Sequence, residues 1–293
     1  MSDELVSGLL KDPGYRVVLV TAGALTRRAR ELHGAGSAAA ALLGEGLMGA
    51  ALMASLQKEQ ARINLQLECD GPLRGFFVDA HPGGALRGYV KNPLVQFVGG
   101  SGRYRWRPVL GNKGYLSVLR DLGGGEYSRS SVELERFAFE GDLERYFEVS
   151  EQLPTHVRFE LVPRGEEPLG SVVGLVVQPL PDADPEAFAT FGESLQADLR
   201  RAVEGLPAEA SASAILKALF SREDLEVMSR YPLAFSCPCS RERVKRALVA
   251  MGRAELTDVL EKDGKAEATC EFCTTHYVIS AEEIRELLAP SAD

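Results

Sequence analysis

The sequences CPCSRERV, residues 237–244, and CEFCTTHY, residues 270–277, place four of the five cysteines of this 293-residue chain within 37 residues. Cys237 and Cys239 form one close pair of thiols, and Cys270 and Cys273 form a second pair. Four thiolates brought together in this way make the closed tetrahedral ligand set that Zn²⁺ takes in structural sites. The spacing therefore predicts that these four cysteines bind one Zn²⁺ ion, and that residues 235–293 fold as a module around it.

Three functions remain open for such a site. The metal can simply stabilise a module of about 60 residues, a size at which an apolar core alone is marginal. It can belong to a nucleic-acid-binding ribbon, but residues 235–293 carry eight Lys and Arg against eleven Asp and Glu, the wrong sign for a phosphate backbone. It can also form a thiol switch, in which an oxidant forms disulfides, the metal leaves and the module unfolds.

Two further residues near these motifs are not predicted to be ligands. His276 follows the second pair, but four sulfurs already complete a closed site. Cys69 lies on the apolar face of a predicted strand, where a free thiol behaves as a small apolar side chain.

Residues 1–178 show patterns of strands and helices together. Ile63, Leu65 and Leu67 alternate with polar residues, a period of two that is typical of a half-buried strand. Such patterns predict strands over 15–20, 63–69, 73–78, 86–90, 115–119, 127–134, 156–162 and 171–177, and helices over 25–32, 37–57 and 142–151. We therefore predict an α+β fold, in which a few helices pack on a sheet-dominated domain.

The pattern changes after Gln178, where three prolines fall within seven residues. From Pro185 the spacing becomes helical and predicts an apolar stripe formed by Phe188, Phe191, Leu195, Leu199 and Val203. A second helix is predicted over 212–220. One layer of helices cannot form a core alone, so these helices must dock on another surface. We divide the chain into a domain over 1–178, a helical linker over 179–234 and the cysteine module over 235–293, with module helices over 240–251, 254–263 and 280–288.

Composition and charge exclude several classes of protein. The net charge is −9, which disfavours nucleic acid and anionic membranes as partners. The longest apolar run, residues 32–57, is interrupted by Glu45 and several glycines, and the first residues are acidic where a secretory signal is basic. We expect a soluble cytoplasmic protein.

Motifs of catalysis are also missing from the sequence. The segment GAGSAA, residues 34–39, fits a permissive dinucleotide pattern, but it follows a predicted helix where that fold requires a strand. The sequence contains no His-Glu-x-x-His, Gly-x-Ser-x-Gly or P-loop motif. We therefore expect a binding protein rather than an enzyme.

The two cysteine motifs, with Cys-x-Cys followed at this distance by Cys-x-x-Cys, resemble the heat shock protein 33 family of bacterial redox-regulated chaperones. The segments GDLERYFEVSEQLPT, residues 141–155, and DGPL, residues 70–73, also resemble that family, and the resemblance covers essentially the whole chain. Cys69 departs from it, since the family usually has Gly there. The segment 91–114, which contains the single tryptophan, Trp106, matches nothing with a known role.

The resemblance implies a mechanism that the spacing alone does not give. In the reduced state the four cysteines hold zinc and the protein is inactive. Oxidants join Cys237 with Cys239 and Cys270 with Cys273, zinc is released, and the linker over 179–234 loses its fold. Such proteins then dimerise, with 1–178 as the dimerisation domain, bind unfolding client proteins without ATP, and pass them to ATP-dependent foldase chaperones.

Two alternatives accompany this reading. The apolar stripe is our candidate client-binding surface, but the same stripe can serve only to dock the linker on the sheet domain. The alternative to a stress-activated holdase is a constitutive zinc-stapled regulatory or nucleic-acid-binding protein.

Overall fold

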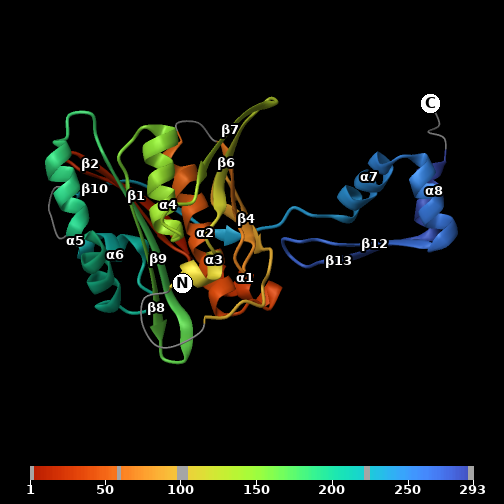
Figure 1. Cartoon of the computed structure of the whole chain (residues 1–293), viewed down its shortest axis with the longest axis horizontal. Helices are drawn as coiled ribbons and strands as arrows, with labels where there is room; N and C mark the ends of the chain where they lie inside the picture. Colours follow the sequence, from red (N-terminus) through yellow and green to blue (C-terminus); the bar gives the residue numbers. More distant parts are fainter. Residues whose placement is uncertain (1–2, 58–60, 98–104, 221–224, 290–293) are drawn as a thin grey trace. The chain divides into compact units, whose positions relative to one another are not determined.

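The computed structural model describes residues 3–57, 61–97, 105–220 and 225–289. The chain forms two compact units, Met1–Ser236 and Cys237–Asp293 (Figure 1). Parts of the predicted linker and of segment 91–114 lie outside the described residues, as do the last four residues of the predicted cysteine module.

The first unit contains a five-stranded antiparallel sheet in the order β10-β1-β2-β9-β8. Its strands are β1 (Glu4–Leu10), β2 (Tyr15–Thr21), β8 (His156–Arg164), β9 (Glu167–Pro179) and β10 (Leu225–Pro232). The central strand β2 is buried along most of its length, because both faces of this sheet are covered by helices. Its sequence, YRVVLVT, accordingly has four consecutive apolar residues, 17–20, in place of an alternation.

A second sheet has six strands in the order β11-β5-β4-β3-β6-β7. They are β3 (Arg62–Cys69), β4 (Gly75–His81), β5 (Ala85–Val90), β6 (Gly114–Gly123), β7 (Glu126–Glu133) and the short β11 (Ala234–Phe235). Within the described residues only β11 runs parallel to its neighbour, pairing Ala234 with Ala85 and Phe235 with Leu86. In β3 the odd residues from Ile63 to Leu67 are buried and the even ones are partly exposed, so one face of this sheet meets the core.

Helix α2 (Ser37–Leu56) lies between the two sheets and forms the centre of the larger core, with contacts to β2 and β9 on one side and to β4 and β5 on the other. Despite Glu45, α2 is long and apolar enough to cross a membrane, with a mean hydropathy of 1.6, but 83% of that window is buried inside the structure. It is therefore a core helix. Helices α1 (Gly23–His33), α3 (Arg107–Leu110) and α4 (Phe139–Tyr146) complete this layer, and a π-helix, η1 (Phe147–Glu151), follows α4.

Helices α5 (Pro185–Glu204) and α6 (Ala212–Leu219) cover the opposite face of the five-stranded sheet (Figure 1). Asp184 caps α5 by accepting from the N–H of Glu186, and Ser211 caps α6 by accepting from the N–H of Ala214. The unit thus has four layers: helices, sheet, helices and sheet.

The second unit is small. It contains α7 (Arg241–Met251), α8 (Arg253–Lys262), the antiparallel hairpin β12 (Lys265–Thr269) and β13 (His276–Ser280), and α9 (Ala281–Leu288). Its buried apolar core consists of Leu256, Ala266, Ile279 and Ile284. No residue of α7 is fully buried, but Val244 and Leu248 are partly buried against this core.

The predicted α+β class is confirmed, and most of the predicted elements are present. The segment 34–39 lies between α1 and α2, as expected for a loop between helices. The predicted helix over 142–151 begins instead at Phe139, and its last turn is the π-helix. Strand β1 was missed because Gly8 interrupts its pattern and both of its faces are largely buried.

The linker prediction needs one correction. Residues 179–234 are not helical throughout, because Leu225–Pro232 form strand β10 at the edge of the first sheet. Most side chains of β10 are exposed, so no alternation marks it in the sequence. These residues belong to the same compact unit as the sheets, which extends to Ser236 because β11 pairs with β5.

Candidate metal centre

The second cysteine pair lies in a tight turn between β12 and β13. The N–H of Cys270 donates to the carbonyl oxygen of Thr275 at 3.0 Å, and the N–H of Thr274 donates to that of Cys270 at 2.8 Å. Thr274 has a left-handed backbone, with φ of 59°. The backbone N–H groups of Phe272 and Cys273 point at the Cys270 sulfur, so the turn offers donors to a negatively charged thiolate.

The first pair precedes helix α7 directly. Ser240 follows Cys239 and caps α7 by accepting from the N–H of Arg243. The two pairs meet sulfur to sulfur. Cys237 Sγ lies 3.6 Å from Cys270 Sγ, and Cys239 Sγ lies 3.2 Å from Cys273 Sγ. All four sulfurs lie within 4.8 Å of one another and are half-buried, which is a group that could hold a metal ion.

The surroundings of the thiols separate their pKa values. Burial raises the pKa of the Cys239 thiol to about 12, and the adjacent Cys273 thiol adds to the rise. Burial also raises the pKa of Cys270. At Cys273 burial acts in the same direction, but hydrogen bonds from Thr275 and the neighbouring thiols outweigh it and lower the pKa to about 6.

These opposed shifts reflect the crowding of four ionisable sulfurs, which cannot all be thiolates without a cation between them. A divalent ion removes this conflict, because it replaces the protons and neutralises the thiolates. Four sulfur donors suit a thiophilic metal. The residues present therefore fit a four-thiolate metal site.

Two residues that the sequence analysis did not single out contact the sulfurs. Tyr277 donates its hydroxyl to Cys239 Sγ at 3.1 Å, which raises the pKa of Tyr277 to about 12. The hydroxyl of Thr275 lies 3.2 Å from Cys273 Sγ. His276 instead lies 3.1 Å from Thr269 Oγ1 and is outside the sulfur cluster. The positions of Thr275 and Tyr277 shortly after Cys273 could have indicated this contact from the sequence, since polar residues beside metal ligands often orient those ligands.

An ion-pair network ties the first cysteine pair to the rest of the unit. Arg241, two residues after Cys239, donates to Glu283 on α9 and to the carbonyl oxygen of Val278 on β13. Lys245 lies 2.9 Å from the same carboxylate. Arg241 and Lys245 hold the pKa of Glu283 well below its usual range. The network thus fixes the start of α7 against β13 and α9.

The apolar stripe of α5 lies against the five-stranded sheet. Phe188, Leu195, Leu199 and Val203 are at most 3% exposed, and Phe191 is partly buried beside them. They pack on residues of β1, β2 and β9, with Tyr15 in edge-to-face contact with Phe188 and Phe191. In this state the stripe is covered.

The other quoted motifs hold loops in place. Asp70 accepts from the N–H groups of Asn112 and Lys113, and the buried Asp142 accepts from three N–H groups of the loop before α4. Trp106 is 8% exposed and packs beside Phe97, so this part of segment 91–114 belongs to the larger core. Cys69 is half-buried on β3, and burial raises the pKa of its thiol.

Two compact units, the smaller of which carries a four-cysteine site for a metal, define a protein with a metal-stabilised module attached to an α+β domain. A family model described as "Hsp33 protein" matches residues 3–280. The 33 kDa chaperonin of Halalkalibacterium halodurans is 32% identical over 98% of this chain and 99% of its own length. That of Picosynechococcus is 36% identical over 98% and 97%.

A crystal structure of the 33 kDa chaperonin of Thermotoga maritima superposes with a TM-score of 0.80, at 29% identity, and covers 98% of both chains. The chain therefore belongs to the Hsp33 family, which confirms the resemblance of its motifs. It is a chaperone, and its relatives are named as chaperonins rather than enzymes.

Proposed function

We propose that this chaperone is a redox-regulated holdase, which binds unfolding proteins without ATP under oxidative stress. In the reduced state Cys237, Cys239, Cys270 and Cys273 hold one Zn²⁺ ion and the protein is inactive. Oxidation joins Cys237 with Cys239 and Cys270 with Cys273, the metal leaves, and the linker over 179–234 loses its fold.

The observation that carries this proposal is the convergence of four sulfurs within 4.8 Å in a unit whose apolar core is very small. Structural zinc contributes about 10–16 kcal/mol in small modules, comparable with the stability of a whole domain. When bound, the ion keeps all four sulfurs as thiolates. Loss of these ligands is therefore expected to unfold the unit.

The oxidation balances with two molecules of hydrogen peroxide. Each peroxide takes two electrons from one pair of thiolates, so that one S–S bond forms and one O–O bond breaks. For each peroxide, two protons from solvent complete two molecules of water, so the whole reaction takes up four protons and forms four molecules of water. Complete reaction converts four thiolates to two disulfides and leaves no negatively charged sulfur to hold the metal.

Client binding is proposed for the stripe of α5, namely Phe188, Phe191, Leu195, Leu199 and Val203. The support is its apolar character together with its coverage in the described state. A surface that is buried when the helix is docked becomes available only when α5 leaves the sheet. Release of the linker would thus switch client binding on.

Further parts of the proposal concern partners and location. We infer that the oxidised protein forms a homodimer through the domain over 1–178, passes its clients to ATP-dependent foldase chaperones, and acts in the cytoplasm. The net charge of −9 argues against nucleic acid as a partner.

The deciding experiment compares reduced and oxidised protein in one assay. Zinc release is followed with a metal-sensitive dye during treatment with peroxide at mildly raised temperature, and aggregation of a chemically denatured client is followed by light scattering. We expect the oxidised form alone to suppress aggregation. Equal activity of the two forms would favour a constitutive zinc-stapled protein instead.

A matched pair of variants assigns the effect to the cluster. Cys270→Ser should uncouple peroxide from activation, because a ligand and a disulfide partner are lost together. Cys69→Ser removes the half-buried thiol of β3 and should activate normally. Normal activation of Cys270→Ser would contradict the assigned role.

A further inference from the structure

The surface of strand β8 beneath helix α5 is polar, unlike the rest of the sheet face that α5 and α6 cover. Side chains alternate along β8, and those on this face are His156, Arg158, Glu160, Val162 and Arg164, of which only Val162 is apolar. On β1, β2 and β9 most of the same face is lined by Val, Leu and Tyr side chains, with Thr21 and Ser171 near the pocket as polar exceptions. Strand β8 is also an edge strand of its sheet.

These polar side chains contact α5 at successive turns. His156 Nε2 donates to the carbonyl oxygen of Phe188 at 2.9 Å, with its ring stacked on that of Phe188 at 4.3 Å between centroids. Arg158 donates to the carbonyl oxygen of Gly192 at 3.0 Å. One turn later Gln196 donates to the carbonyl oxygen of Phe159 at 3.3 Å. Residues four apart lie on one side of a helix, so the three contacts form a line.

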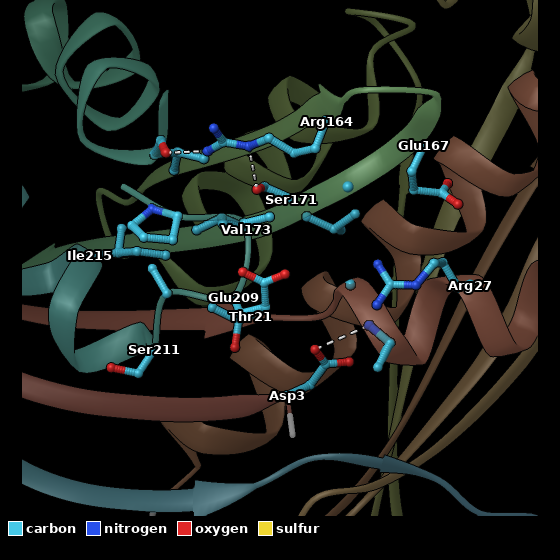
Figure 2. Close-up of a pocket in the computed structure, with 18 residues that line it drawn as sticks. Asp3, Thr21, Arg27, Arg164, Glu167, Ser171, Val173, Glu209, Ser211 and Ile215 are labelled. Atoms are coloured by element: carbon cyan, nitrogen blue, oxygen red, sulfur yellow. Dashed lines mark hydrogen bonds between the residues drawn. The ribbon is translucent and has the colours of Figure 1, made fainter. Parts of the chain in front are cut away.

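Arg164 holds the C-terminal end of α5. Its guanidinium donates to the carbonyl oxygens of Val203 and Glu204. Its Nε donates to Ser171 Oγ at 3.0 Å (Figure 2). These carbonyl oxygens belong to the last turn, which lacks donor partners within the helix and favours a cation, although that of Val203 also accepts from the N–H of Leu206 at 3.3 Å. A pocket of about 280 Å³ lies beside Arg164, under the connection from α5 to α6 (Figure 2). Packing by apolar side chains is therefore incomplete at this end.

Gly192 is required for this close approach. A Cβ atom at position 192 would lie 2.2 Å from Cε1 of His156 and 2.4 Å from its Nε2. The imidazole cannot move aside without losing its hydrogen bond and its stacking on Phe188. The contact between β8 and α5 thus depends on a glycine at the second turn of the helix.

We propose that the polar face of β8, with Gly192 opposite His156, is the release element of the linker helix. This inference rests on the proposed function, and the residues just described are the ones that position α5. Hydrogen bonds are replaced by water at small net cost, whereas an apolar face resists exposure. Directional contacts also allow α5 to dock again in one register only. Once α5 leaves, charged side chains protect the exposed edge strand from pairing with other chains.

The variant Gly192→Ala tests the contact, because helix propensity and the steric clash change the stability of α5 in opposite directions. Alanine is the better helix former, so helix propensity alone would make α5 more stable. The steric contact with His156 predicts the reverse. In the reduced, metal-loaded protein we expect α5 amides to exchange hydrogen at least tenfold faster in Gly192→Ala, with client binding before oxidation.

The double variant His156→Ala/Gly192→Ala isolates the contact. Without the imidazole the added methyl group has space, so in the His156→Ala background the same substitution should slow exchange or leave it unchanged. Ser194→Ala, on the exposed side of α5, is the control for propensity and should not accelerate exchange. Acceleration of equal size in both backgrounds, or none in either, would overturn the proposal.

A second substitution covers the case in which Gly192→Ala does not fold. Arg164→Met should accelerate exchange over residues 199–204 by at least fivefold, whereas Arg201→Met, at an exposed arginine, should not. Unchanged exchange in Arg164→Met would count against the release element. A different result would separate the two proposals. If α5 exchanges faster in the variants, but neither the variants nor the oxidised wild-type protein bind client, the holdase function is refuted and the docking contacts are established.

Discussion

Removing the metal from the reduced protein should unfold the second unit and leave the larger core of the first unit folded. Over its described residues, 237–289, the second unit has three buried large apolar side chains, Leu256, Ile279 and Ile284. At about 1.5–3 kcal/mol each, they contribute about 5–9 kcal/mol. A four-cysteine zinc site contributes about 10–16 kcal/mol, which is more than this core supplies. The first unit has two much larger apolar clusters and no part in the site.

Amide hydrogen exchange with and without a chelator measures this prediction. A contribution of about 10 kcal/mol corresponds to about seven powers of ten in the folding equilibrium. Amides of β12 and β13 should therefore change from strong protection to rates near those of an unfolded chain. The single tryptophan, Trp106, lies buried in the first unit and serves as an internal control, because its fluorescence should not change.

Continued protection of β12 and β13 in protein shown by elemental analysis to be free of metal would contradict this prediction. A change in the fluorescence of Trp106 together with the exchange of the second unit would contradict it as well. The first result would mean that the small core suffices without the ion. The second would mean that the metal stabilises the larger core as well.

Two further predictions concern the first unit. Gly83→Ala and Gly84→Ala both place alanine at a positive φ, but only at position 84 would the Cβ atom meet a backbone oxygen, that of Pro232 at 2.1 Å. Gly84→Ala should therefore lower the melting temperature clearly more than Gly83→Ala does. Equal shifts in melting temperature would contradict the clash. Burial alone would raise the pKa of Asp79, but Arg62, Asn64 and Arg87 outweigh burial and lower the pKa. Ionised Asp79 therefore stabilises the folded state above its unfolded pKa of about 3.9, and this stabilisation is lost as the pH falls below that value. Asp79→Asn should thus lower the free energy of unfolding, measured with urea at pH 7, by about 2–4 kcal/mol. It should also flatten the dependence of stability on pH below pH ~4. An unchanged pH profile would exclude the ion pairs of Asp79 as the source of that dependence.

Much of the local structure follows from the sequence because its patterns are local. The period of two in residues 63–69 and the helical spacing after Pro185 each arise from one face meeting a core. Strand β10 has no such signal, since an edge strand with both faces exposed needs no alternation. Strand β1 is hidden for the opposite reason, because it is largely buried on both faces.

The cysteine motif was enough to predict that the four sulfurs converge and which family the chain belongs to, since thiolate chemistry and a rare motif are properties of residue type and order. What the motif could not give is the surroundings of the sulfurs. Thr275, Tyr277 and the ion pair of Arg241 with Glu283 act through distances that only the folded unit sets.

The sequence by itself thus determined the α+β class, the four cysteines and the apolar stripe of α5, because residue chemistry and periodicity carry them. Only the tertiary structure decided that this stripe is covered in the described state, and that α5 meets a polar strand edge at Gly192. The partners of a helix face lie in other elements, and His156 and Arg158 are more than thirty residues from the carbonyls of α5 that they contact, so this pairing leaves no pattern within the helix itself.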